Sequence, residues 1–212
     1  MLYHCAFIIL YAKIFTMKNF ILFFSLFVVC SLSAFAGGTF PPNGKKCEVE
    51  GMVIYVDKSC TMNVSWREML WEFENNPEIF IGSVSENCVD SVVWKHVYGE
   101  GWDIKTYEKI DKSPVVGFTL NQCKNFAVFR ATAVMELFKY GMFKQYKDTK
   151  LEYFMLSSEQ YAELLKQKWF AKSFVDGYAE ITSDGKFVKD GKILDSVDDG
   201  KVTFRMYAVI TE

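Results

Sequence analysis

Hydrophobic and polar residues alternate along most of this chain, but its first 36 residues are almost entirely apolar. Within them, Met17-Lys18-Asn19 gives a short basic start, Phe20–Leu32 is an apolar run, and Ala34-Phe35-Ala36 supplies a cleavage site of the small-x-small type. The run is short for a membrane span of about 20 residues and is followed by Gly-Gly-Thr-Phe-Pro-Pro rather than a basic stop. The pattern predicts a signal peptide over 17–36 that is cleaved on export.

Residues 1–16 stand in front of this signal peptide, so that the whole leader covers 1–36. We favour Met17 as the true start over a longer leader of two parts. A lipid anchor at Cys30 is a second alternative, but a lipoprotein signal has a small residue directly before the cysteine, and Val29 stands there. Cleavage after Ala36 therefore fits the sequence better, and the folded part of the protein is expected after this residue.

Residues 37–46, rich in Gly and Pro, predict a loop. The Val-, Ile- and Tyr-rich run 48–57 then predicts a strand. Ser65 and Glu68 have the spacing of a capping box, which predicts a short helix that ends near Asn75-Asn76-Pro77.

Two further segments, 91–98 and 102–110, show alternating apolar residues on either side of Gly99-Glu100-Gly101. This pattern predicts a pair of antiparallel strands, with His96 on the same strand face as Trp94. His96 is then expected to be a partly buried histidine.

The strongest helical signal begins with Thr119 and Gln122, a second capping box, and runs to Tyr140, where Gly141 ends the helix. Small residues at Ala127 and Ala131 allow this helix to lie close against a sheet. The charged residues of the same helix are expected to stay in water, namely Arg130, Glu136 and Lys139.

The C-terminal part predicts a strand over 150–156 and a helix that begins at Ser157 and ends around Phe174. Asp-Gly pairs at 184–185, 190–191 and 199–200 are typical of hairpin turns, and the alternating run 202–210 predicts the closing strand.

Strands grouped apart from helices favour the α+β class, with an antiparallel sheet packed by one long and one shorter helix. The expected organisation is one α+β domain over 47–212, which could divide into an N-terminal subregion 47–110 and a C-terminal core 111–212.

Cysteine usage fits an oxidising compartment, because four cysteines remain after the leader: Cys47, Cys60, Cys88 and Cys123. Three pairings are open. We favour Cys47–Cys60 with Cys88–Cys123, since the first pair flanks the predicted strand and could staple a short hairpin. The spacing C-x-x-C is absent, so neither a redox motif nor a zinc knuckle is indicated.

Charge argues against a nucleic-acid partner. The leader contains Lys13 and Lys18 and no acidic residue, so 22 basic and 26 acidic residues of the chain remain after it, a net charge of −4. The many aromatic residues indicate a large core. The alternative is an exposed binding surface built from Trp66, Trp94, His96 and Trp102.

Candidate chemistry is sparse. His96 is the only histidine after the leader, so a histidine metal cluster is excluded, and no nucleophile motif accompanies it. No catalytic residue, metal ligand or cofactor is therefore assigned.

Carboxylates beside tryptophans leave one route to hydrolysis, because glycosidases use paired acids. The acids in question are Glu68, Glu72, Glu74, Glu100 and Asp103. The capping box accounts for Glu68 and a hairpin turn for Glu100 and Asp103, so this route stays the alternative.

A resemblance covers about residues 115–210. The alanine-spaced helix in Gln122–Tyr140 and the segment Asp190–Ile210 resemble the helix and closing hairpin of the small bacterial outer-membrane lipoprotein and flagellar-assembly-T group. The resemblance implies a non-catalytic, envelope-associated α+β domain. Residues 47–110 have no counterpart in that group, and no functional residue is carried over from it.

These observations favour an exported, non-catalytic protein that binds or scaffolds an envelope protein or a glycan. It is expected in the periplasm or outside the cell, with or without association with the outer membrane, and without a membrane span after cleavage. The alternatives are a secreted glycan- or peptide-acting enzyme that uses the segment 66–103, and a small secreted toxin or inhibitor.

Overall fold

The computed structural model describes residues 40–99, 109–139, 143, 146, 148–198 and 200–211. The chain divides into two compact units, Met1–Pro42 and Asn43–Glu212, and the fold below is that of the second unit. The predicted leader and Trp102 lie outside the described residues.

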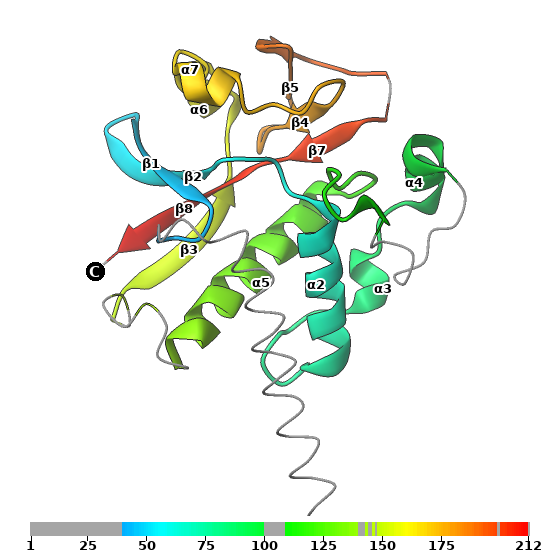
Figure 1. The fold of residues 1–212 in the computed structure, drawn as a ribbon, viewed down its shortest axis with the longest axis vertical. Helices are drawn as coiled ribbons and strands as arrows, with labels where there is room; N and C mark the ends of the chain where they lie inside the picture. Colours follow the sequence, from blue (N-terminus) through cyan, green and yellow to red (C-terminus); the bar gives the residue numbers. More distant parts are fainter. Residues whose placement is uncertain are drawn as a thin grey trace, which may run out of the picture. The chain divides into compact units, whose positions relative to one another are not determined.

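The second unit contains helices and strands in mixed order (Figure 1). The helices are α2 Asn63–Asn75, α3 Val84–Asn87, α4 Ser91–Tyr98, α5 Leu120–Lys139, α6 Ser158–Leu164 and α7 Lys168–Ala171. The strands are β1 Gly44–Val49, β2 Met52–Asp57, β3 Lys150–Met155, β4 Ala179–Ile181, β5 Phe187–Lys189, β6 Lys192–Leu194, β7 Val202–Phe204 and β8 Met206–Thr211. The predicted α+β class is confirmed, but the strands form two sheets instead of one.

The first sheet has the antiparallel order β1-β2-β8-β3. The predicted single strand 48–57 is wrong, because Glu50 and Gly51 have φ of 53° and 75° and turn the chain back on itself. Two successive residues with positive φ make the tight turn that suits the twist of a hairpin. The strand β8, from the C-terminal end, lies between β2 and β3.

Each face of the first sheet packs against a different helical layer. On one face, Ile54 and Val56 belong to a buried cluster that includes Tyr161 of α6 and Phe170 of α7. On the other face, α5 lies along β3, as predicted for this helix (Figure 1). Ala127 is buried there and Ala131 is half-buried.

The long helix α5 begins as the sequence predicts. The backbone N–H of Thr119 donates to Oε1 of Gln122 at 2.8 Å, and the backbone N–H of Gln122 donates to Oγ1 of Thr119 at 3.2 Å. These reciprocal bonds are the predicted capping box.

Helix α2 begins earlier than predicted, at Asn63. Its first N–H groups donate to backbone oxygens of a distant segment, Asn63 to Ser113 at 2.9 Å and Val64 to Asp111 at 3.1 Å. Since these carbonyls satisfy the helix start, the predicted capping box of Ser65 and Glu68 is wrong and both residues lie inside the helix. The predicted end of the helix at Asn75 is confirmed.

The segment 91–98 is helix α4, so the predicted strand is wrong. Oδ1 of Asp90 accepts the N–H groups of Val92 and Val93 at 2.7 and 3.3 Å, and Gly99 ends the helix with a φ of 86°. In helical geometry Trp94 is buried and His96 is exposed, so the two residues do not share a strand face. Of the predicted partner strand, residues 102–108 lie outside the described part of the chain, and 109–110 form a short helical turn.

The helix predicted to begin at Ser157 is α6, and Ser157 and Gln160 form a capping box at its start. The helix predicted to continue to Phe174 is wrong, however, because it is interrupted after Leu164 and resumes as the short α7.

The second sheet has the order β6-β5-β4-β7. Asp190-Gly191 forms the predicted hairpin turn between β5 and β6, with φ of 51° and 72°. The turn predicted at 199–200 does not join neighbouring strands, because β6 and β7 lie at opposite edges of this sheet and β7 pairs with β4 in parallel. The closing strand is also two strands, β7 and β8, with Arg205 between them.

Among the described residues, no helix combines the length and hydrophobicity needed to cross a bilayer.

Candidate functional site

A buried ion pair lies where the chain passes from one sheet to the other. Arg205 is fully buried between β7 and β8, and its Nε and Nη2 donate to the two carboxylate oxygens of Glu180 in β4, at 2.9 and 2.6 Å. The guanidinium also lies over the rings of Phe170 and Phe174, at 4.7 and 5.1 Å from their centroids. The planar guanidinium thus has a bidentate partner at its edge and aromatic rings on its face.

Further hydrogen bonds join this ion pair to neighbouring side chains. The hydroxyl of Tyr161 donates to Oε2 of Glu180 at 2.7 Å, and Nη1 of Arg205 donates to Oγ of Ser173 at 2.5 Å. Burial, and the negative charge of Glu180, raise the pKa of Tyr161 well above its usual value. The arrangement holds the charges in fixed internal bonds and leaves Tyr161 protonated.

A second buried pair joins α5 to the first sheet. Arg130 makes a bidentate pair with Asp57 of β2, through Nη2 to Oδ1 at 2.8 Å and through Nη1 to Oδ2. Its guanidinium lies 4.3 Å from the centroid of the Tyr153 ring. The backbone oxygen of Asp57 also accepts from Arg205 at 3.4 Å, so Asp57 links the two pairs. The prediction that Arg130 stays in water is wrong, because this helix face meets a buried carboxylate.

Glu68 is the carboxyl group with the most altered chemistry near these pairs. Burial raises its pKa to about 7, while Arg67 and Arg130 lower it and Asp111 and Glu72 raise it. The two arginines already have carboxylate partners, since Arg67 bonds to Asp111 at 2.7 Å and Arg130 to Asp57. Glu68 can therefore exchange a proton near neutral pH.

The charge of Asp111 acts on Glu68, and the buried Oδ1 of Asp111 has no hydrogen-bond partner among the described residues. The other acids of the predicted carboxylate route lie in different surroundings. Glu72 accepts from Asn76, Glu74 is exposed, and Glu100 and Asp103 lie outside the described residues.

Two tryptophans of the alternative aromatic surface, Trp66 and Trp94, are buried, and Trp102 lies outside the described residues. Trp66 is fully buried, stacks on Phe126 with centroids 5.5 Å apart, and donates from Nε1 to the backbone oxygen of Asn87 at 3.1 Å. Trp94 is buried against Tyr98, whereas His96 is exposed. The indole rings of Trp66 and Trp94 therefore belong to the interior, and the interpretation of them as a binding surface is wrong.

The four cysteines are free thiols in the structure, so the predicted disulfides Cys47–Cys60 and Cys88–Cys123 are not present. Cys47 lies opposite Ile54 in the hairpin, whereas Cys60 lies three residues after the end of β2. The hairpin therefore separates the two thiols instead of joining them.

The cysteine side chains are poor nucleophiles in these positions. Burial raises the pKa of Cys60 to about 12, and it raises the pKa of Cys47, Cys88 and Cys123 as well. The reactive form of cysteine is the thiolate, which these environments disfavour. Within the described ranges, no group of three or more His, Cys, Asp and Glu residues is placed to hold a metal ion.

The position of Arg205 in the sequence is a signal for a buried ion pair. Arg205 is the only charged residue in the apolar run 202–210, and a charge in such a position needs a buried partner. The partner, Glu180, lies in another strand and carries no local pattern that identifies it.

Comparison of the chain with protein-family models, with curated proteins and with solved structures gives no match.

Proposed function

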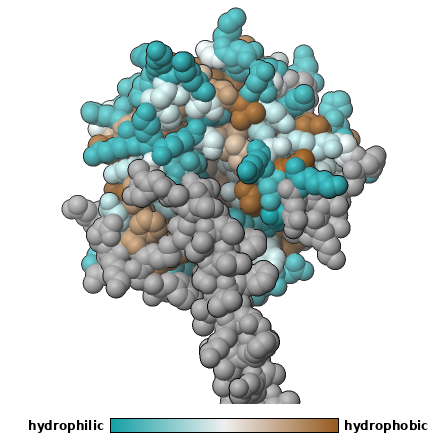
Figure 2. Space-filling view, in the orientation of Figure 1, coloured by the Kyte–Doolittle hydropathy of each residue, from teal (hydrophilic) through white to brown (hydrophobic). Residues whose placement is uncertain are grey.

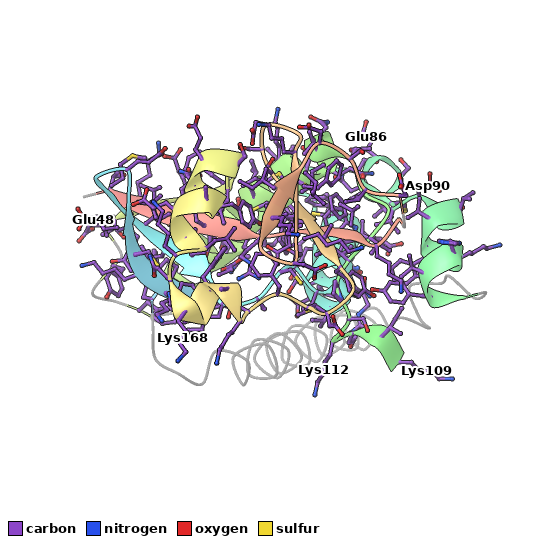
Figure 3. All side chains as sticks on the ribbon, turned by 90° about the horizontal axis from the view of Figure 1, so that it is seen from above. Glu48, Glu86, Asp90, Lys109, Lys112 and Lys168 are labelled. Carbon is purple, nitrogen blue, oxygen red and sulfur yellow. The ribbon has the colours of Figure 1, made fainter. Side chains whose placement is uncertain are left out.

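We propose that the protein is an exported, non-catalytic binding or scaffolding domain of the cell envelope. The observation that carries the proposal is the direction of its polar groups. Arginines and carboxylates are groups that enzymes often use in catalysis. Here they bond to each other inside the fold, in the pairs Arg205–Glu180 and Arg130–Asp57. Several charged side chains outside this interior point away from the ribbon, as Figure 3 shows for Glu48, Glu86, Lys109, Lys112 and Lys168.

The surface supports the same proposal. On the face seen in Figure 2, hydrophobic residues of the described part lie in separate small areas among hydrophilic ones. Two features of the sequence support a location in the envelope. They are the signal peptide proposed over 17–36 and the resemblance of residues 115–210 to the outer-membrane lipoprotein and flagellar-assembly-T group. The partner of such a domain is then an envelope protein or a glycan.

Cell fractionation of a bacterium expressing the full chain with a C-terminal tag tests the location. We expect the tagged protein in the periplasm, the outer membrane or the medium, with an intact mass that begins at Gly37. Retention in the cytoplasm at full length would contradict export. A lipid-modified form that begins at Cys30 would show that a lipid anchors the protein to the membrane.

One observation favours a second function, that of a secreted glycan- or peptide-acting enzyme. Glu68 has a pKa of about 7, which suits a general acid, and Glu72 lies one helical turn away. Hydrolysis of envelope glycans and peptides should be measured with the exported protein and with Glu68→Gln. We expect no turnover by either protein. Turnover that Glu68→Gln abolishes while the fold is kept would establish the enzyme instead.

A further inference from the structure

Strand β3 forms an open edge of the first sheet. All six of its residues pair with β8, and no other described strand pairs with its opposite side. Its sequence, KLEYFM, contains neither proline nor glycine, so no residue of the strand lacks the N–H group or the strand propensity that a further paired strand needs. Unpaired N–H and C=O groups along such an edge are a template for a further strand.

The two faces of β3 differ in what covers them. Leu151 and Tyr153 are buried on the face that meets α5. Lys150, Glu152 and Phe154 share the opposite face because side chains alternate along a strand. On that face Phe154 is 42% exposed, and its ring lies 5.6 Å from that of Tyr207. The edge therefore presents a lysine, a glutamate and an exposed aromatic ring in one row.

This row is complementary to itself. When two identical strands pair in antiparallel order about a two-fold axis, the side chains of opposed residues lie on the same face of the sheet. Even-numbered residues of one copy therefore lie opposite even-numbered residues of the other, and odd-numbered residues opposite odd-numbered ones. With Leu151 on the axis, residues 150–152 of the two copies pair, and Lys150 of each copy lies opposite Glu152 of the other. These contacts replace the ion pair within one copy, in which Nζ of Lys150 lies 3.1 Å from Oε1 of Glu152. Two charge-complementary cross-strand pairs then form from one sequence.

We propose that β3 is a self-association edge, at which two copies of the chain join their first sheets into one continuous sheet of eight strands. The occupant is a second copy because the charges of the edge match their own two-fold image. The other edge strand, β1, also has lysine and glutamate two residues apart, Lys46 and Glu48, but none of its own large apolar residues is exposed. The inference does not depend on the proposed function.

Sedimentation equilibrium on the exported protein tests the pairing with two single variants, Lys150→Glu and Glu152→Lys. The unaltered protein should form dimers. Each variant alone sets like charges opposite each other, so its dissociation constant should rise by about tenfold or more. An equimolar mixture should recover dimers, since one variant presents two carboxylates where the other presents two ammonium groups.

The double variant that exchanges the two charges, Lys150→Glu with Glu152→Lys, should also dimerise, and far-UV circular dichroism checks that every variant is folded. Lys46→Glu on β1 is the matched control and should leave the dimer unchanged. A monomeric wild-type protein would overturn the proposal and would mean that the charges protect the edge. Dimers that persist in both single variants, a mixture that stays monomeric, or loss of the dimer in Lys46→Glu would overturn it as well.

Discussion

Arg205 carries its charge at a position where the residues on both sides, Phe204 and Met206, are fully buried. Replacing it by methionine leaves Glu180 in the interior without its bidentate partner. We expect Arg205→Met to lower the free energy of unfolding by about 3–5 kcal/mol, because an uncompensated buried charge is strongly unfavourable. Urea unfolding followed by circular dichroism measures the loss.

The control for this prediction removes both charges together. The double variant Glu180→Leu with Arg205→Met should be more stable than Arg205→Met alone, since no unpaired charge remains. If the double variant lost as much stability as the sum of the two single variants, the charges would not be coupled in the way that their geometry indicates.

Glu68 makes stability depend on pH in an unusual direction. Its pKa is raised from 4.5 to about 7 in the folded protein, so between these values the folded state holds a proton that the unfolded state has lost. The contribution of Glu68 to stability is therefore present below about pH 4.5 and is lost as pH rises through about 7. Glu68→Gln should remove this loss. The stability of Glu68→Gln relative to the unaltered protein should therefore be higher at pH 8 than at pH 5.

Urea midpoints at both pH values provide the measurement, and Glu74→Gln, at an exposed position of the same helix, provides the control. The two variants should differ in how their midpoints change with pH. Equal behaviour of Glu68→Gln and Glu74→Gln would show that Glu68 titrates as an ordinary surface carboxyl.

At the scale of elements, the cap of α4 can be tested in isolation. Removing the side-chain oxygen of Asp90 leaves the N–H groups of Val92 and Val93 without their acceptor. We expect Asp90→Ala to cost about 1 kcal/mol and Asp90→Asn to cost less, because asparagine also caps helices. Hydrogen exchange of the α4 amides should quicken in Asp90→Ala, and unchanged exchange would mean that tertiary packing alone holds the helix.

Local signals predicted elements where the bonding partners are close in sequence. The capping box at Thr119 and the helix start at Ser157 are predicted correctly because the partners in both caps lie within four residues. The start of α2 could not be predicted in this way, since its acceptors are the backbone oxygens of Asp111 and Ser113. For 91–98, the β-branched and aromatic residues suggested a strand, although Asp90 and Gly99 are helix-end signals.

The candidate site was the least predictable part for the same reason. Arg130 and Asp57 are 73 positions apart, and nothing in the helix pattern distinguishes Arg130 from an exposed arginine. Trp66 and Trp94 belong to the interior that the many aromatic residues indicate, and the alternative of an exposed surface is wrong for both because the helices α2 and α4 bury them.

For the molecule as a whole, we expect the two sheets to unfold together. One buried cluster contains Val56 of the first sheet, Val188 of the second sheet and Phe170 of α7, and only Arg205 separates β7 from β8. Tryptophan fluorescence and far-UV circular dichroism should therefore give coincident urea transitions. Two separate transitions would show that the sheets are independent in stability.

The place of β8 in the first sheet has a consequence for how the protein is made. Tyr55 pairs with Ala208, so β2 must wait for more than half of the chain to be synthesised before its neighbour exists. Until then only the β1–β2 hairpin can form, and an isolated two-stranded hairpin is marginally stable in water. The growing chain therefore leaves the ribosome with this sheet still open. For a chain bound for export, as proposed above, the late strand keeps the first sheet incomplete until the C-terminal residues have been synthesised.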